Sequence, residues 1–286
     1  MDQANSKVPN RDRIQRGLVA VILAAAVVYS LFPIAWLVLN SFKTRLDMFA
    51  VPPIWLVENP TLGNYVQAFV ERPYLQFMAN SVVVALATTL LSLSLGTLAG
   101  YALARFDYPG RMRSHVSFWI LSTRMLPPIV TIVPLYLFFA RLQLLDTRTA
   151  LVIAYTGFNL PFVVWTMRSY FAEIPRELEE SAMVDGDGRF GAFRRVVLPL
   201  AKPGLAATAI FCFILSWNEL LFALILTETS AANTLPIGIA GRITQYKVEW
   251  GEISASGFAA CVPIIIFAFI LQKHLVRGLS FGAVKG

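Results

Sequence analysis

Long apolar stretches alternate with short polar segments along the whole chain. Four of the stretches carry no charged residue, and two more carry a single one, Arg124 or Glu219. A helix that crosses a bilayer needs roughly 20 mostly apolar residues, because about 30 Å of hydrocarbon is crossed at about 1.5 Å per residue. The pattern predicts an all-α integral membrane protein with six transmembrane helices, at about residues 18–40, 76–104, 116–140, 149–171, 204–227 and 254–274.

The composition agrees with this class of protein. Hydrophobic residues make up 57% of the chain and charged residues 14%, against about 45–50% and about 25% in soluble domains. The first apolar stretch follows three arginines, so a cleaved signal peptide is the alternative to an uncleaved anchor. Signal cores run about 7–15 residues, whereas this stretch continues to Leu39 and favours the anchor. Cys212 and Cys261 fall inside predicted spans and are expected to be packing residues.

The uneven distribution of Lys and Arg predicts the orientation. Sixteen of them lie in the segment 1–17, the loop after the second span, residues 168–202 around the loop after the fourth span, and the end of the chain from Lys273 onward, against seven in the other loops. Basic loops stay on the cytoplasmic side of a membrane. We therefore expect both termini in the cytoplasm, flanking one permease domain over residues 18–277. The net charge of +7 largely reflects this bias and does not indicate nucleic-acid binding.

The loop over residues 175–203 is predicted to form a helix-turn-helix on the cytoplasmic side. Pro175 suits the start of a helix with an acidic first turn, and Asp185-Gly186 favours a turn. Apolar residues at helical spacing then continue to Pro199, which closes the second helix. These faces are too small for a core of their own. We expect them on the membrane domain or in a partner's groove; a loop lying on lipid headgroups is the alternative.

Glu219 is the single carboxylate inside a predicted span. A charge at the bilayer centre costs roughly 2.5–3.5 kcal/mol on insertion scales, so it normally faces a partner or a wet cavity. Ser216, Trp217 and Asn218 precede it, and Ser216 would share its helix face. Two interpretations stay open. The group lines a translocation path, or it forms a structural hydrogen bond to a neighbouring helix or subunit.

The third span contains three prolines together with Arg124. Prolines remove backbone hydrogen bonds, so this helix is either broken beside a pathway or merely bent for packing. Arg124 either snorkels to the interface or faces the interior. In the second span, Gly96 and Gly100 predict close approach of another helix.

Two external segments also carry turn or cap signals. Thr61 is expected to cap a short helix in the Pro-rich segment 43–72. The run Thr234–Gly238 predicts a tight reversal in the external loop 228–252.

Several kinds of chemistry are missing from the sequence. The dinucleotide Gly-Lys does not occur, so the chain has no phosphate-binding P-loop and is not an ATPase by itself. His115 and His274 have no Cys or carboxylate at ligand spacing, so no metal site is expected. We predict no catalytic residue and no bound cofactor.

The helix-turn-helix loop resembles the EAA loop of bacterial ABC-importer permeases. That pattern is EAA, three residues, Gly, nine residues, Ile, one residue and Leu-Pro; here it is matched by Glu180-Ser181-Ala182, Gly186, Val196 and Leu198-Pro199. Ser181 and Val196 are mild departures, and Asp187 stands where a small residue is common. Further segments resemble the six-span partner subunit of maltose-type carbohydrate permeases: Ser41–Lys43, Tyr101–Phe106, Trp217–Glu219 and Gly278–Gly286.

The resemblance implies a type I ABC importer permease and assigns roles to matching positions. The residues that couple to the ATPase would be Glu180, Ser181, Ala182, Asp185, Gly186, Phe193, Leu198 and Pro199. The tail residues that approach the ATPase would be Gly282, Lys285 and Gly286. The external contact with a substrate-binding protein would involve Leu235, Pro236 and Gly238, and the translocation path would involve Trp217, Asn218, Glu219 and Arg124.

The resemblance also implies partners and a location. Such importers combine two related permease subunits, two ATPase subunits that bind ATP and Mg²⁺, and one external binding protein. We therefore expect a subunit of the bacterial cytoplasmic (inner) membrane that imports a sugar or polyol. One alternative is an ion-coupled secondary transporter that uses Glu219 and Arg124 as relay groups, although a lone carboxylate and no inverted repeat count against it. Another is a non-transporting membrane scaffold.

Overall fold

A computed structural model describes residues 10–245 and 247–282. Four helices in it are long and apolar enough to cross a membrane. They are α1 (Asn10–Ser41), α4 (Tyr74–Arg105), α7 (Arg148–Glu173) and α14 (Trp250–Gly282). These apolar segments form helices because a helix satisfies every backbone hydrogen bond within the segment itself. The all-helical membrane fold predicted from the apolar pattern is confirmed.

Two further candidate spans are strongly bent pairs of helices. α5 (Met112–Thr123) and α6 (Pro128–Arg141) meet at 85°, and the run Arg189–Leu200 meets α11 (Lys202–Trp217) at 73°. The described residues therefore hold four spans, or up to six if each bent pair is one span. Of the two alternatives for the third predicted span, the structure has the broken helix. Pro128 occupies the first turn of α6, where a missing N–H costs nothing.

The fifth predicted span, 204–227, is not one helix. α11 ends at Trp217, and a separate helix, α12, covers Leu221–Leu226. The expectation that Ser216 and Glu219 share a helix face is therefore wrong. Likewise Pro199 does not close the hairpin's second helix, because that helix continues to Leu200 before the chain bends into α11.

Short elements connect the long helices. Thr61 accepts a hydrogen bond from the Gly63 backbone N–H at 3.0 Å, at the start of the short helix that was expected there. The expected reversal over Thr234–Gly238 is wrong, since this segment begins a helix with Pro236 in its first turn. The short elements are α2 (Arg45–Met48), α3 (Gly63–Val66), the π-helical turns η1 (Gln67–Glu71) and η2 (Phe193–Val197), α8 (Arg176–Val184), α9 (Arg189–Ala192), α10 (Leu198–Leu200) and α13 (Leu235–Ala240).

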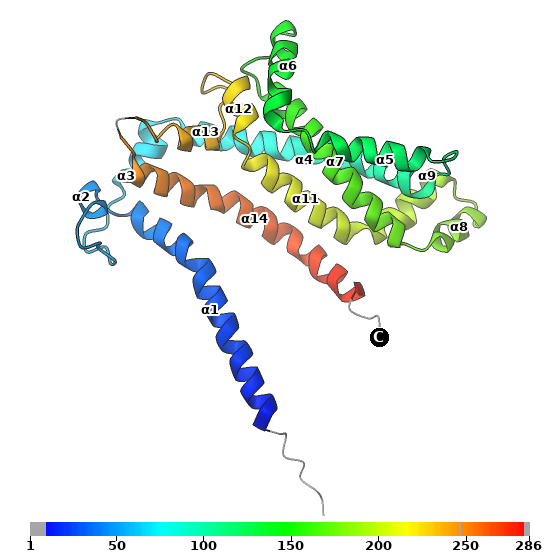
Figure 1. Ribbon diagram of the computed structural model, residues 1–286, viewed down its shortest axis with the longest axis horizontal. Coiled ribbons are helices and arrows are strands. Elements are labelled where there is room, and N and C mark those ends of the chain that lie inside the picture. Colours follow the sequence, from blue (N-terminus) through cyan, green and yellow to red (C-terminus); the bar gives the residue numbers. More distant parts are fainter. Residues whose placement is uncertain (1–9, 246, 283–286) are drawn as a thin grey trace, which may run out of the picture.

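The core forms where α4 lies along α7, and α11 packs beside both (Figure 1). Two glycines let α4 approach closely. A Cβ on Gly96 would lie 2.6 Å from the side chain of Val163, and one on Gly100 would lie 2.9 Å from the backbone nitrogen of Arg168. The close approach predicted for this pair of glycines is confirmed, because small residues let helix backbones come together.

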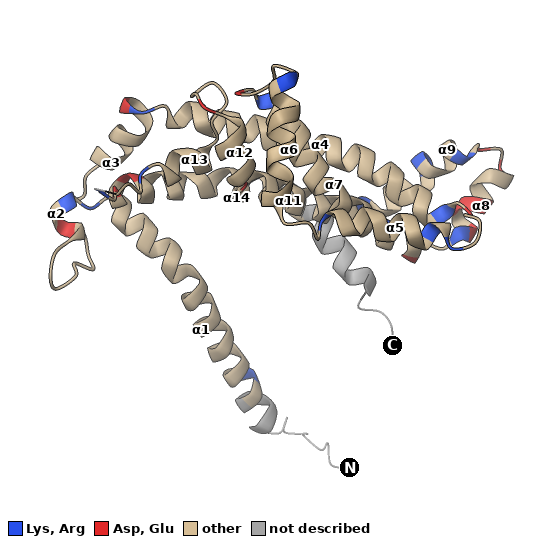
Figure 2. Ribbon diagram, turned by 45° about the horizontal axis from the view of Figure 1, so that its top comes forward, with Lys and Arg blue, Asp and Glu red and all other residues tan. Residues whose placement is uncertain are grey.

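Helix α1 leaves this bundle at the end that carries α2 and diverges from it (Figure 1). Its apolar window is not buried within the chain at all, and it packs along α14 near its end. Charged residues gather instead at the two ends of the molecule, with a smaller group at the free end of α6 (Figure 2). One charged end carries α2 and α3, the other carries α8 and α9, and the helices between them are almost free of charge (Figure 2). This distribution is the one expected of a protein whose middle lies in lipid.

Candidate functional site

The hairpin predicted from residues 175–203 forms at one charged end of the bundle. α8 begins after Pro175 and ends at Val184, and its first turn holds acidic residues that favour a helix N-terminus. Gly186 then adopts a φ of +100°, a conformation that only glycine accepts without strain. The chain reverses there and continues as α9, η2 and α10. The predicted break at Asp185-Gly186 is confirmed.

A buried ion pair ties this hairpin to the end of α4. The Nε of Arg105 lies 2.8 Å from a carboxylate oxygen of Glu179, and the two side chains are 7% and 9% exposed. The Tyr101 hydroxyl donates to the other oxygen of the same carboxylate. Arg105 also donates to the carbonyl of Ile174 at 2.8 Å. Each buried charge thus has several partners, as a buried ion pair requires.

Apolar contacts hold the second half of the hairpin on the same helices. Phe193 is buried, with its ring centroid 4.4 Å from that of Tyr101 and 6.2 Å from that of Phe171. Val197 is fully buried in the same cluster, beside Met167. The hairpin's inner face therefore lies on the membrane domain, which was one of the two placements expected for it.

The exposed surface of the hairpin carries acidic, apolar and basic side chains, the basic ones being Arg176, Arg189, Arg194 and Arg195. Glu180, Ser181 and Asp185 are exposed, and Val184 and Phe190 are 87% and 69% exposed. Two large apolar side chains that are exposed beside charged residues fit the rim of a protein interface.

The predicted coupling residues therefore divide into two groups. Glu180, Ser181, Asp185, Gly186 and Pro199 are exposed, whereas Ala182 and Leu198 are half-buried and Phe193 is buried. Asp187, where a small residue is common, forms an ion pair with Arg195 across the turn. The turn is therefore compatible with Asp187, and Phe193 supports the hairpin from within.

Sequence reasoning missed the anchor that Tyr101, Arg105 and Glu179 form. The segment Tyr101–Phe106 was noticed only for its resemblance to a family, with no role given to it. A usable signal was present nonetheless. Arg105 ends a long uncharged run, and such a charge at the end of a span needs a carboxylate or water. Glu179 adjoins the span at the same predicted membrane side, so pairing the two would have been a reasonable hypothesis.

The polar group around Glu219 lies in the break between α11 and α12. The Glu219 carboxylate accepts hydrogen bonds from the backbone N–H groups of Phe222, at 3.0 and 3.2 Å, and of Ala223, at 3.4 Å. It therefore caps α12. Trp217 is buried and stacks on Phe213. Asn218 alone is exposed, so these residues do not form one surface.

Arg124 lies just before the break between α5 and α6. Its guanidinium lies 5.4 Å from the ring centroid of Phe158 and 5.3 Å from that of Phe162, both on α7. One guanidinium nitrogen is buried without a hydrogen-bond partner in the described part of the chain. Of the two placements expected for Arg124, its side chain takes the interior one, and it forms no ion pair with Glu219 among the described residues.

At the opposite charged end, α13 packs on the start of α4. Leu235 is fully buried, and Gly238 lies against Phe77 and accepts a hydrogen bond from Tyr74 at 2.7 Å through its carbonyl oxygen. Of the three residues assigned to contact with a binding protein, only Pro236 keeps partial exposure. In the tail, α14 runs to Gly282, while Lys285 and Gly286 lie outside the described residues.

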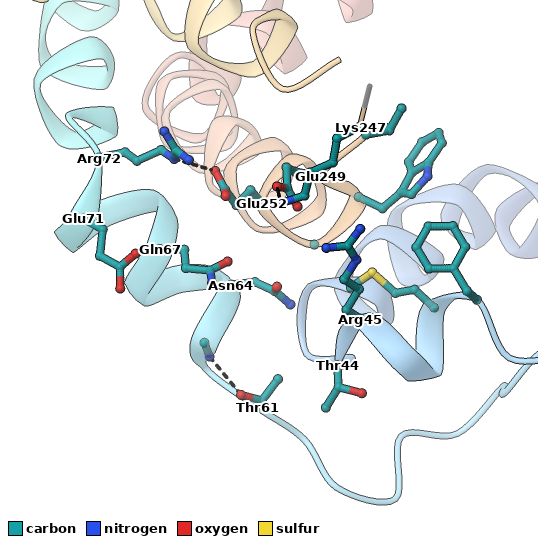
Figure 3. A pocket seen from close by; sticks show the side chains of 16 residues that line it. Thr44, Arg45, Thr61, Asn64, Gln67, Glu71, Arg72, Lys247, Glu249 and Glu252 are labelled. Carbon is teal, nitrogen blue, oxygen red and sulfur yellow. Dashed lines mark hydrogen bonds and ion pairs between the residues drawn. The ribbon is translucent and has the colours of Figure 1, made fainter. Parts of the chain in front are cut away.

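The same end carries a polar pocket of about 390 Å³ between α2, α3 and the start of α14 (Figure 3). Arg72 reaches from the η1 side to the buried carboxylate of Glu252 at 3.1 Å. Burial lowers the pKa of the nearby Lys43 ammonium, although the Asp47 carboxylate acts in the opposite direction. These groups fix the junction of α1, α3 and α14.

The loop between α6 and α7 is attached to the loop after α12 through Asp146. Its carboxylate accepts hydrogen bonds from the backbone N–H groups of Glu228 and Thr229, both at 2.9 Å, and from the Thr229 hydroxyl at 2.6 Å. Burial alone would raise the pKa of Asp146, but these hydrogen bonds favour the charged form and the net pKa is lowered.

Comparison with known proteins identifies the class of this architecture. Residues 94–281 match the family described as binding-protein-dependent transport system inner membrane component. The sulfoquinovosyl glycerol transport system permease protein SmoH of Agrobacterium fabrum is 38% identical over 92% of this chain and 93% of its own length. The trehalose/maltose transport system permease protein MalG of Thermococcus litoralis is 35% identical over 94% of this chain and 96% of its own.

A solved structure shares the fold. One chain of a bacterial ABC transporter involved in the import of the acidic polysaccharide alginate superposes with a TM-score of 0.75, over 94% of this chain and 99% of that one. Sequence identity there is 23%, so the likeness concerns the fold.

The matched residues contain the hairpin, its anchor on α4 and the broken helices, so the comparison covers the site described above. The prediction of a permease subunit whose ATPase is a separate protein is confirmed. This chain belongs to the family of inner membrane components of binding-protein-dependent ABC transport systems.

Proposed function

We propose that this chain is the translocating subunit of an importer that moves a sugar or polyol into the cytoplasm. We also propose that an ATPase subunit binds the hairpin 175–203. The observation that carries this proposal is the two-sided hairpin. Its inner face is fixed to α4 and α7 by a buried ion pair and by Phe193. Its outer face exposes Glu180 and Val184. A hairpin fixed on one face and exposed on the other would transmit a displacement by a partner protein to α4 and α7 as a rigid body.

The mechanism follows from that rigidity. Closure of two ATPase subunits on ATP would draw this hairpin and the equivalent one of a second permease subunit together. Because Glu179 and Phe193 are attached to α4 and α7, those helices would turn with the hairpin. The translocation path would then close to the cytoplasm and open to the outside. A rigid element with two positions is what coupling between distant sites requires.

The substrate class rests on the relatives. SmoH is a permease for sulfoquinovosyl glycerol and MalG a permease for trehalose and maltose. Both names describe glycosides, which supports a sugar or sugar-like cargo for this chain. An external binding protein would deliver it at the end that carries α13, and both chain termini would lie in the cytoplasm, on the side of the hairpin.

Helix α1 supports a second permease subunit as partner. Its window Gln15–Ser41 is highly apolar and not buried within the chain. A helix that is apolar on all sides belongs in lipid or against another helix. We assign part of that surface to the related permease subunit of the complete transporter.

Crosslinking tests the hairpin assignment. A Val184→Cys variant of the assembled transporter should crosslink to an ATPase subunit carrying a P-loop, because that side chain is 87% exposed on the outer face. Val51→Cys is the matched control, since Val51 is 94% exposed at the other charged end. Capture of lipid alone by Val184→Cys, with an intact ATPase in the preparation, would refute the proposal.

Glu219→Gln separates transport driven by the ATPase from a proton relay. The amide oxygen can still accept from the Phe222 backbone, so the cap of α12 and ATP-dependent uptake should persist. Loss of uptake, together with uptake by the wild-type subunit without ATP, would favour the ion-coupled transporter.

A further inference from the structure

A basic hollow lies between α5 and α7 at the end of the molecule that carries the hairpin. It has a volume of about 550 Å³. Three arginines line it, Arg111, Arg113 and Arg168, and none of its described lining residues is an Asp or Glu. The lining of the hollow therefore carries a net positive charge, with the exposed Asp107 beside Arg113 as the one carboxylate paired with it among the described residues, and such a charge raises the local concentration of anions.

Two of the three arginines have no carboxylate partner in the described part of the chain. Arg111 and Arg168 form no ion pair there, and Arg113 lies 3.7 Å from Asp107, whose side chain is 95% exposed. Arg168 is held over the ring of Trp165, with 5.5 Å between the guanidinium carbon and the ring centroid. Stacking of this kind positions a guanidinium and leaves its N–H groups free to donate.

A buried hydroxyl points to the same ligand. Ser117 lines the hollow and is 6% exposed, and its Oγ has no hydrogen-bond partner among the described residues. A buried hydroxyl without a hydrogen-bond partner costs free energy unless a bound molecule forms a hydrogen bond with it. An oxygen-rich anion in the hollow would accept from this hydroxyl. The N-terminus of the 12-residue helix α5 adds its positive dipole end at the same place.

The remaining wall of the hollow is apolar and continues onto the lipid-facing surface. Phe118 is 64% exposed and Trp165 is 44% exposed, and both line the hollow together with Leu121. Arginines at one end and an apolar wall at the other match a molecule with a charged head and an acyl chain. Basic pockets between spans on the cytoplasmic side bind anionic headgroups.

We propose that this hollow binds a phosphate group, and that the phosphate is the headgroup phosphodiester of an anionic phospholipid. Arg111, Arg113 and Arg168 hold the phosphate oxygens, and the Ser117 hydroxyl donates to one of them. The acyl chain lies along Phe118 and Leu121. The lipid thereby joins the start of α5 to the cytoplasmic end of α7, next to the hairpin anchor.

Native mass spectrometry of the assembled transporter, incubated with equal amounts of phosphatidylglycerol and phosphatidylcholine, tests the site. The wild-type complex should retain phosphatidylglycerol selectively. Each arginine near an anionic headgroup changes affinity about fivefold, so Arg113→Gln/Arg168→Gln should weaken retention about thirtyfold. Arg148→Gln is the control, because Arg148 is an exposed arginine at the opposite end of α7.

A second arm identifies the source of the phosphate. Phe118→Ala should weaken phosphatidylglycerol retention and leave binding of inorganic phosphate unchanged, because only the lipid has an acyl chain. Inorganic phosphate that binds without lipid selectivity, and is lost in the double arginine variant, would refute the lipid as ligand and keep the phosphate site. Unchanged binding of both probes in the double variant would overturn the proposal. If that variant does not assemble, Ser117→Ala and Arg168→Gln are measured singly by the same criteria.

Discussion

Breaking the buried ion pair between Arg105 and Glu179 should release the hairpin from α4. Both side chains are almost fully buried, at 7% and 9% exposure, and their charged atoms are 2.8 Å apart. Removing one member of such a pair leaves an uncompensated buried charge and costs about 3–5 kcal/mol. In Arg105→Met the Tyr101 hydroxyl still donates to the carboxylate, which places the expected cost near about 3 kcal/mol.

The cost should appear as local opening. Hydrogen exchange of the amides in residues 176–184 reports the free energy of that opening. A change of about 3 kcal/mol corresponds to a rise in exchange of roughly a hundredfold. Exchange in the middle of α4 should hardly change. Uptake should fall while ATP hydrolysis by the complex continues, because the hairpin no longer moves α4.

A double variant distinguishes this anchor from a generally fragile region. Replacing both partners by apolar groups is often neutral or stabilising, so Arg105→Met/Glu179→Leu should restore most of the protection. Arg141→Met is the control, since Arg141 is exposed and has no ion pair among the described residues. Unchanged exchange in Arg105→Met, or costs that simply add in the double variant, would refute the reasoning.

Three further predictions concern the turn of the hairpin, the contact between α4 and α7, and the loop that holds Asp146. Gly186→Ala should reduce uptake by straining a residue at φ +100°, whereas Gly188→Ala, with φ −73° and open space at its Cβ, should transport normally. Gly100→Leu should lower the melting temperature of the complex, because its Cβ would meet backbone atoms at 2.9 and 3.0 Å, and Gly157→Ala should not. The pKa of Asp146 is lowered in the folded protein, so its carboxylate adds stability above pH 3.8, the ordinary pKa of the group, and this contribution is lost as pH falls through the lower pKa of the folded state. The melting temperature of Asp146→Asn, measured over the same pH range, should not show that loss.

The length and apolar character of the spans made much of the fold predictable. The spans expected at 76–104 and 149–171 correspond to α4, Tyr74–Arg105, and α7, Arg148–Glu173. A long uncharged run has few alternatives to a helix in lipid, so its position follows from sequence alone. The hairpin turn was predictable for a similar reason, since Asp-Gly favours a turn whatever surrounds it.

The broken spans could not be predicted with the same certainty. Hydropathy does not show whether Glu219 reaches a neighbouring helix or the N–H groups just after it. Both occur: the carboxylate caps α12 through the Phe222 and Ala223 amides, which lie within 3.4 Å of it, and the Tyr155 hydroxyl of α7 donates to the Glu219 backbone carbonyl at 3.5 Å. A similar ambiguity explains the error at Pro236, since proline suits both a turn and a first helical turn.

The anchor of the hairpin depends on packing that no single segment encodes. Arg105 and Glu179 are 74 positions apart, and they meet because α4 lies on α7 in one register. That register is fixed where Gly100 touches the backbone of Arg168. Tyr101 is the next residue after that contact, and Arg105 comes about one helical turn later. Both side chains therefore lie at the start of α8. A hairpin held this way cannot move without turning α4, and α4 cannot turn without moving α7. On α7, Phe158 and Phe162 lie against Arg124, at the break between α5 and α6. The glycines that let two helices touch are thus also what connects the surface of the hairpin to the broken helices.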